Sequence, residues 1–178
     1  MTKWLRAMQR VAAAGLFLTI TLVTVSGSHA DRLASEAADS TIPSFELVTF
    51  GGEVFTDKTL QGEPTLLVFW APWCNVCQRE LPLLEQFYRQ STPPQFRILS
   101  IGFADTRTNV AAFVKAHPNV FVFPTAYDED RWVASAFKVN ATPTYVLIDA
   151  GAKIGLVHRG GGLLQSVRFR EILSALNR

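Results

Sequence analysis

The chain of 178 residues is long enough for one ordinary domain that buries a hydrophobic core of its own. Apolar residues make up 48% of it and charged residues 18%, with 13 Phe and 4 Trp, which excludes an intrinsically disordered chain. Lys3, Arg6 and Arg10 precede the first acidic residue, Asp31, and the remainder carries 14 basic against 15 acidic residues, so no nucleic-acid partner is indicated.

Residues 1–30 have the layout of an export signal. A basic stretch precedes an apolar run at residues 11–25, and Ser28 and Ala30 supply the small residues that a signal peptidase needs. The run has a length that fits either a cleaved signal peptide or a membrane anchor through residues 11–27, and both interpretations stay open. A core helix of a cytosolic protein is disfavoured, because the charges cluster before the run. Both open interpretations predict a periplasmic or otherwise extracytoplasmic protein, soluble after cleavage or anchored to the inner membrane.

A tether and a hairpin are predicted next. Residues 31–41 are rich in Ala, Ser and Asp without apolar periodicity, which is typical of a tether and leaves residues 42–178 as the folded domain. Residues 45–50 and 53–55 are strand-like and flank Gly51-Gly52, which favours an N-terminal β-hairpin.

The rest of the domain alternates predicted strands with predicted helices. Buried-strand patterns occupy residues 65–70, 96–103, 144–148 and 154–157, and helical spacing occupies residues 75–90, 108–117, 132–137 and 163–176. This alternation, which ends in a strand hairpin, predicts an α/β fold with a sheet of mixed direction.

Cys74 and Cys77 stand at C-x-x-C spacing where a predicted buried strand passes into a helix. At a helix N-terminus the unpaired N–H groups and the dipole favour a thiolate, so Cys74 is the expected nucleophile. Cys77 lies one turn later on the same side and is expected to be better shielded, which suits it to resolve a mixed disulfide. The pattern predicts a thiol–disulfide oxidoreductase with disulfide-containing protein substrates and no cofactor beyond the redox-active disulfide Cys74–Cys77.

Three other kinds of cysteine site are the alternatives to redox exchange. A structural zinc site needs two further ligands, and the chain has no second cysteine pair, while His117 and His158 stand in isolated contexts. A structural disulfide that closes so short a loop restricts the unfolded chain little. A peroxide-reducing cysteine is expected in the motif P-x-x-x-T-x-x-C, where Ala71 here replaces the Thr. Export and the strand-to-helix context favour redox exchange, and no metal is predicted.

Several motifs together resemble a known family. They are F-W-A-P-W-C-x-x-C at residues 69–77, E-L-P at 80–82, and A-T-P-T-Y-V-L-I-D at 141–149, followed by Gly151. From about residue 42 onward the sequence resembles the TlpA/ResA-like, DsbE/CcmG-related family of membrane-associated thioredoxin-like oxidoreductases. The resemblance implies a thioredoxin fold, in which helices flank a central mixed β-sheet, with an N-terminal β-hairpin extension and an insertion at residues 103–132.

The resemblance also implies a substrate-binding role for Trp73, Thr142 and Pro143. It implies that Pro143 is cis and lies beside the disulfide, so that Thr142 presents backbone groups to an extended substrate segment. On base rates alone, an ordinary trans strand start would be expected at this position.

Glu80 is the third candidate catalytic residue. It lies three residues after Cys77, where family members have a carboxylate coupled to the thiols, and it is expected to accept the proton of Cys77. The alternative is a solvated first-turn Glu that only supports the helix dipole. Thioredoxins have a buried Asp at the position of Val68, so Glu80 or water must replace that base here.

The direction of electron flow is predicted from the residues between the cysteines. Asn75 and Val76 include no cation that would strongly stabilise a thiolate, which favours a reductant over an oxidant. The resemblance implies that a membrane thiol transporter of the DsbD/CcdA type supplies electrons and that apocytochrome c is among the substrates. A periplasmic oxidant is the alternative, and a redox-inactive binding or chaperone module is the alternative of another class, disfavoured by the intact cysteines.

Overall fold

The computed structural model describes residues 41–90 and 96–176. The predicted signal peptide or anchor lies outside these residues, as does the predicted tether except for its last residue. Within the described ranges, no helix combines the length and the hydrophobicity that a membrane span requires.

A five-stranded sheet of mixed direction forms the centre of the molecule, as predicted. Its strands, in spatial order, are β5 (Thr125–Tyr127), β4 (Arg97–Gly102), β3 (Thr65–Trp70), β6 (Thr144–Ile148) and β7 (Ile154–Arg159). The strands β3, β4 and β5 are parallel, while β6 runs antiparallel to both β3 and β7. All six residues of β3 are buried, because the central strand of the sheet is covered on both faces.

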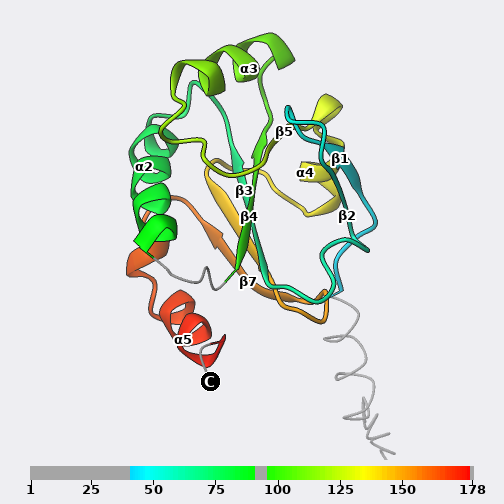
Figure 1. The fold of residues 1–178 in the computed structure, drawn as a ribbon, viewed down its shortest axis with the longest axis vertical. Helices are drawn as coiled ribbons and strands as arrows, with labels where there is room; N and C mark the ends of the chain where they lie inside the picture. Colours follow the sequence, from blue (N-terminus) through cyan, green and yellow to red (C-terminus); the bar gives the residue numbers. More distant parts are fainter. Residues whose placement is uncertain (1–40, 91–95, 177–178) are drawn as a thin grey trace, which may run out of the picture.

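Helices and a hairpin cover the two faces of this sheet (Figure 1). The remaining elements are the hairpin strands β1 (Glu46–Val48) and β2 (Val54–Thr56), the α-helices α2 (Asn75–Gln90), α3 (Arg107–Ala116), α4 (Trp132–Ala136) and α5 (Val167–Leu176), and the short 3-10 helices η1 (Glu129–Arg131) and η2 (Leu163–Gln165). Figure 1 shows α2 and α5 on one side of the sheet, and the hairpin with α4 on the other.

The two faces of β3 supply two separate cores. Leu67 and Phe69 point into the core under the hairpin and α4, whereas Val68 and Trp70 point into the core under α2 and α5. This division follows from the strand, whose successive side chains alternate between the faces of a sheet. Cys77 belongs to the second core, so the cysteine pair is attached to the sheet through packed apolar side chains.

Besides shifts of one or two residues at the ends of other elements and the short η1, two elements differ from the sequence-based expectation. The last helix begins at Val167 rather than at residue 163, because residues 163–165 form a 3-10 turn and Ser166 is extended, with ψ 124°. The short strand β5 was not predicted, since Thr125–Tyr127 has no distinctive pattern and is held by pairing with β4.

Candidate active site

The cysteine turn, residues 70–77, connects the central strand β3 to the helix α2. β3 ends at Trp70, and α2 begins at Asn75, so Cys74 immediately precedes the helix. The N–H of Cys74 donates to Ala71 O at 3.1 Å, and Cys74 O accepts the N–H of Gln78 at 3.1 Å, which closes the first turn. The structure therefore has the junction of buried strand and helix that the sequence predicts, with Cys74 at the helix N-terminus.

Cys74 and Cys77 are joined in a disulfide with their Cα atoms 5.2 Å apart. Cys77 is completely buried, and Cys74 is 5% exposed. The N–H of Cys77 donates to Cys74 Sγ at 3.0 Å. When the pair is reduced, an N–H directed at Cys74 Sγ would stabilise a thiolate on that sulfur and not on Cys77.

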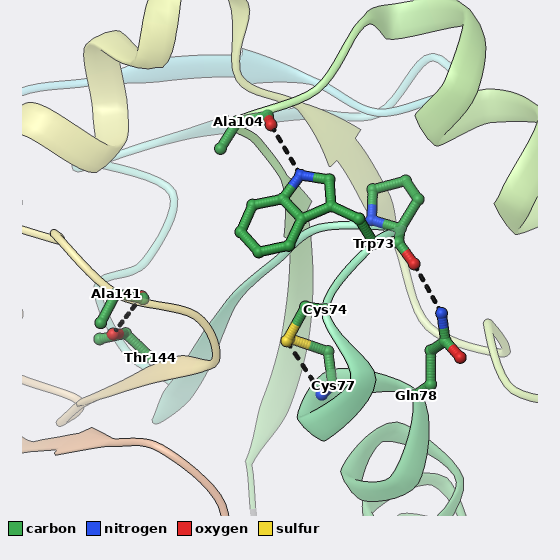
Figure 2. Close-up of a disulfide and its surroundings, with 8 residues drawn as sticks. Trp73, Cys74, Cys77, Gln78, Ala104, Ala141 and Thr144 are labelled. Atoms are coloured by element: carbon green, nitrogen blue, oxygen red, sulfur yellow. Dashed lines mark hydrogen bonds between the residues drawn. A yellow bond between two sulfur atoms is a disulfide. The ribbon is translucent and has the colours of Figure 1, made fainter.

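Two hydrogen bonds to residues outside the cysteine turn hold its middle, at Pro72 and Trp73 (Figure 2). Trp73 is 59% exposed, and its indole Nε1 donates to Ala104 O at 3.0 Å. Ala104 follows β4 and has φ 58°, a left-handed conformation that is uncommon for alanine. Gln78 Nε2 donates to Pro72 O at 2.7 Å. Sequence reasoning missed the contacts of Ala104 and Gln78, because they join residues without a recognisable motif.

Pro143 follows a cis peptide bond, as the family resemblance implies. Phe69 pairs with Thr144 across β3 and β6, so buried Pro143 lies at the end of the sheet where the cysteine turn begins. Figure 2 shows Ala141 and Thr144, on either side of Thr142 and Pro143, in the surroundings of the disulfide. Within the described part of the chain, the half-buried Thr142 has no backbone hydrogen bond.

Glu80 contacts a loop after β7. Its Oε2 accepts the N–H of Gly162 at 2.9 Å, and within residues 41–90 and 96–176 it makes no hydrogen bond to either cysteine. Gly162 belongs to residues 160–162, here called the glycine loop. Glu80 is half-buried and lies one helical turn beyond Cys77, on the same face of α2. The predicted catalytic carboxylate is therefore held one turn beyond Cys77 by a contact between segments far apart in the chain.

Tyr145 is a further buried polar group on this side of the sheet. It pairs with Val68 across β6 and β3, next to the strand position where thioredoxins have their buried Asp. Burial raises the pKa of the Tyr145 phenol, and the negative charge of Glu80 raises it further. The strand period could have placed Tyr145 on the face of Val68, but the sequence does not show its proximity to Glu80.

No metal centre accompanies these groups among the residues that the structure describes, where no three His, Cys, Asp or Glu side chains are placed to share an ion. The groups that the structure gathers at the site are two cysteines, a carboxylate and a phenol.

Known proteins with similar sequences and structures carry out thiol–disulfide chemistry. The thiol-disulfide oxidoreductase ResA of Halalkalibacterium halodurans is 29% identical over 149 residues, which are 83% of this chain and 83% of that protein. The thiol:disulfide interchange protein DsbE of Vibrio cholerae is 26% identical over 165 residues, 92% of this chain and 86% of that protein. The structure of DsbF from MTB (Mycobacterium tuberculosis), in mixed oxidized and reduced forms, is 30% identical with a TM-score of 0.65, and the match covers 76% of this chain and 99% of that one.

The family model described as the AhpC/TSA family matches residues 38–157. This range includes the cysteine turn, Glu80 and Pro143, and it covers more than half of the chain. The chain therefore belongs to the AhpC/TSA family, as a thioredoxin-fold thiol–disulfide oxidoreductase of the ResA/DsbE type with the cysteine pair Cys74 and Cys77.

Proposed function

We propose that this protein reduces selected disulfides of exported proteins, with Cys74 as the nucleophile and Cys77 as the resolving cysteine. The observation that carries the proposal is the asymmetry of the pair: the N–H of Cys77 is directed at Cys74 Sγ from 3.0 Å, at the start of α2. The helix dipole and this donor both favour a thiolate on Cys74. Cys77 is completely buried, so it reacts with a sulfur that is already attached to Cys74.

The reduction proceeds through two exchange steps. The Cys74 thiolate attacks one sulfur of a substrate disulfide, forms a mixed disulfide and releases the other substrate sulfur as a thiolate. Cys77 then loses its proton and attacks Cys74 Sγ, which forms the Cys74–Cys77 disulfide and releases the second substrate sulfur. Two electrons pass to the substrate, and a dithiol donor must reduce the pair again.

Glu80 is the proposed acceptor of the Cys77 proton. It lies three residues after Cys77 on the same face of α2, and its carboxylate is held in place by the N–H of Gly162. Val68, at the position of the thioredoxin Asp, has no group that accepts a proton.

An extended substrate segment is proposed to bind next to the disulfide. The exposed indole of Trp73 offers apolar contact area, and Pro143 lies immediately before β6, at the end of the sheet where the cysteine turn begins. The backbone of Thr142 has no partner in the described part of the chain and can pair with an extended peptide, as an added strand would.

The proposed partners and location follow from the family resemblance and from the N-terminal sequence. Electrons would come from a membrane thiol transporter of the DsbD/CcdA type, and the substrates would include the haem-binding thiols of apocytochrome c. The layout of residues 1–30 supports a periplasmic or otherwise extracytoplasmic protein, either free or attached to the inner membrane through residues 11–27.

Equilibration of the full-length protein with glutathione mixtures tests the direction of electron flow. A reductant is expected to have a potential near that of thioredoxin, about −270 mV, and a value near that of DsbA, about −120 mV, would favour the oxidant alternative. The binding-module alternative predicts that the double variant Cys74→Ser/Cys77→Ser suppresses aggregation of an unfolded protein as well as the wild type does.

A further inference from the structure

One peptide unit of the glycine loop lies between a histidine and the proposed catalytic carboxylate. His158 Nε2 lies 3.0 Å from Gly161 O, and the N–H of Gly162 donates to Glu80 Oε2 at 2.9 Å. The C=O of Gly161 and the N–H of Gly162 belong to the same planar peptide group. Because a carbonyl oxygen only accepts, His158 must donate from Nε2. The imidazole and the carboxylate are thus joined through a single peptide group.

The glycine loop packs directly on the first turns of α2. A Cβ atom built on Gly161 would lie 3.0 Å from Glu80 Oε1 and 3.1 Å from Val76 Cγ1. Gly162 has φ +82°, a conformation that side-chain-bearing residues rarely adopt. Val76 stands between the two cysteines, so the loop that holds Glu80 also contacts the cysteine turn. A side chain at position 161 would therefore press on both the carboxylate and the cysteine turn.

The surroundings of His158 contain few other titratable groups. Tyr145, its pairing partner across β6 and β7, has its ring 5.9 Å away, and burial together with Glu80 raises the pKa of the Tyr145 phenol. Arg159 follows His158 on β7 and points to the opposite face of the sheet. On α5, which packs against β7, Arg168, Arg170 and Glu171 are all exposed. Within residues 41–90 and 96–176, Tyr145 contacts the His158 ring, and Glu80 is linked to it through the Gly161–Gly162 peptide.

We propose that His158 is a positioning residue for Glu80, which acts through the Gly161–Gly162 peptide and transmits its own protonation state to the carboxylate. An imidazolium polarises the Gly161 carbonyl more strongly than a neutral imidazole, and this makes the Gly162 N–H a better donor. A stronger hydrogen bond to an ionised carboxylate favours its charged form. Protonation of His158 therefore weakens Glu80 as a proton acceptor, and the effect on disulfide release rests on the proposed function of Glu80.

The amide proton of Gly162 tests this proposal in the full-length reduced protein by ¹H–¹⁵N NMR. In the wild type we expect a downfield signal that moves further downfield as the His158 ring takes up a proton, with the same midpoint. His158→Gln keeps an N–H donor but cannot gain a proton, so the signal should stay downfield and stop responding to pH. His158→Phe keeps a ring beside Tyr145 without a donor, so the signal should move upfield.

Glu80→Gln is the reference variant, because it weakens the acceptor of the same hydrogen bond and should also move the Gly162 signal upfield. An unchanged Gly162 signal in His158→Phe, or a wild-type signal that ignores the His158 titration, would overturn the proposal. The Gly162 signal is measured without turnover, so a failure of this inference can be told apart from a failure of the proposed function.

The rate of disulfide release gives a second, kinetic test. In the wild type, the rate of release from the mixed disulfide should fall as His158 takes up a proton, and His158→Gln should lose this step in the pH profile.

Discussion

The two sides of the active site are assembled in different ways. The cysteine turn takes Cys74 and Cys77 from one short stretch between β3 and α2, with a hydrogen bond inside the pair itself. The glycine loop brings Glu80 together with His158 and Tyr145, from α2, β7 and β6, and the contact of Glu80 with Gly162 spans 82 positions. The sulfur chemistry is therefore a local property of one turn. The proposed control of the proton depends on the packing of three elements.

Both sides of the active site pack on the core under α2 and α5. Removing a large side chain from this core should therefore cause the largest loss of stability. Phe169 is fully buried and packs on the rings of Phe87 at 6.3 Å and Phe96 at 6.1 Å. Phe169→Ala should lower the free energy of unfolding by about 3–5 kcal/mol in denaturant titrations. Val167→Ala, at a 64% exposed position on the same helix, should change it by less than about 0.5 kcal/mol. Equal losses in the two variants would show that α5 does not support the site.

Glu80→Gln should damage the proton chemistry while it leaves the cysteine turn intact. Without the nearby negative charge, more of the reduced pair should be thiolate at a given pH. Release of the substrate from the mixed disulfide should slow near neutral pH, by a factor at the lower end of the about 10²–10⁴ that a general base supplies. Thiol titration and insulin-reduction rates measure the two effects. If Glu80 only supports the helix dipole, stability should fall by less than about 1 kcal/mol and turnover should stay unchanged.

Gly161→Ala should have the mildest effect on the site, because it adds one methyl group where the glycine loop packs on α2. The new Cβ would press on Glu80 Oε1 at 3.0 Å and on Val76 Cγ1 at 3.1 Å, with an expected cost of about 1 kcal/mol. Slower disulfide release should accompany this loss, because the carboxylate is displaced. Gly155→Ala is the matched control on β7, where the Cβ would lie at an ordinary 3.6 Å from Leu147 O. Identical stability and rates for the two variants would argue against a tight contact between the glycine loop and α2.

The same contrast explains how much could be predicted from the sequence. The bounds of β3 and α2 were predicted correctly, because a continuous apolar run and a helical period mark them without reference to the rest of the chain. The disulfide was predicted from spacing, and cis Pro143 from the family resemblance.

Contacts between distant segments could not be predicted in this way. The bond from Trp73 to Ala104, and the bonds of His158 and Glu80 to one peptide group, depend on how β4, β7 and α2 pack. The late start of α5 had a local signal that was missed: Ser166 precedes the helix and accepts the N–H of Phe169, as an N-cap residue does.

The central claim is the division of labour between the cysteines, and trapping of mixed disulfides tests it most directly. Cys77→Ser removes the resolving thiol while the nucleophile remains, so this variant should accumulate mixed disulfides with its substrates through Cys74. Cys74→Ser should accumulate none, because Cys77 is completely buried. Non-reducing electrophoresis and mass spectrometry of the trapped species would identify both the sulfur and the substrate. Equal trapping by the two variants would contradict the assigned roles.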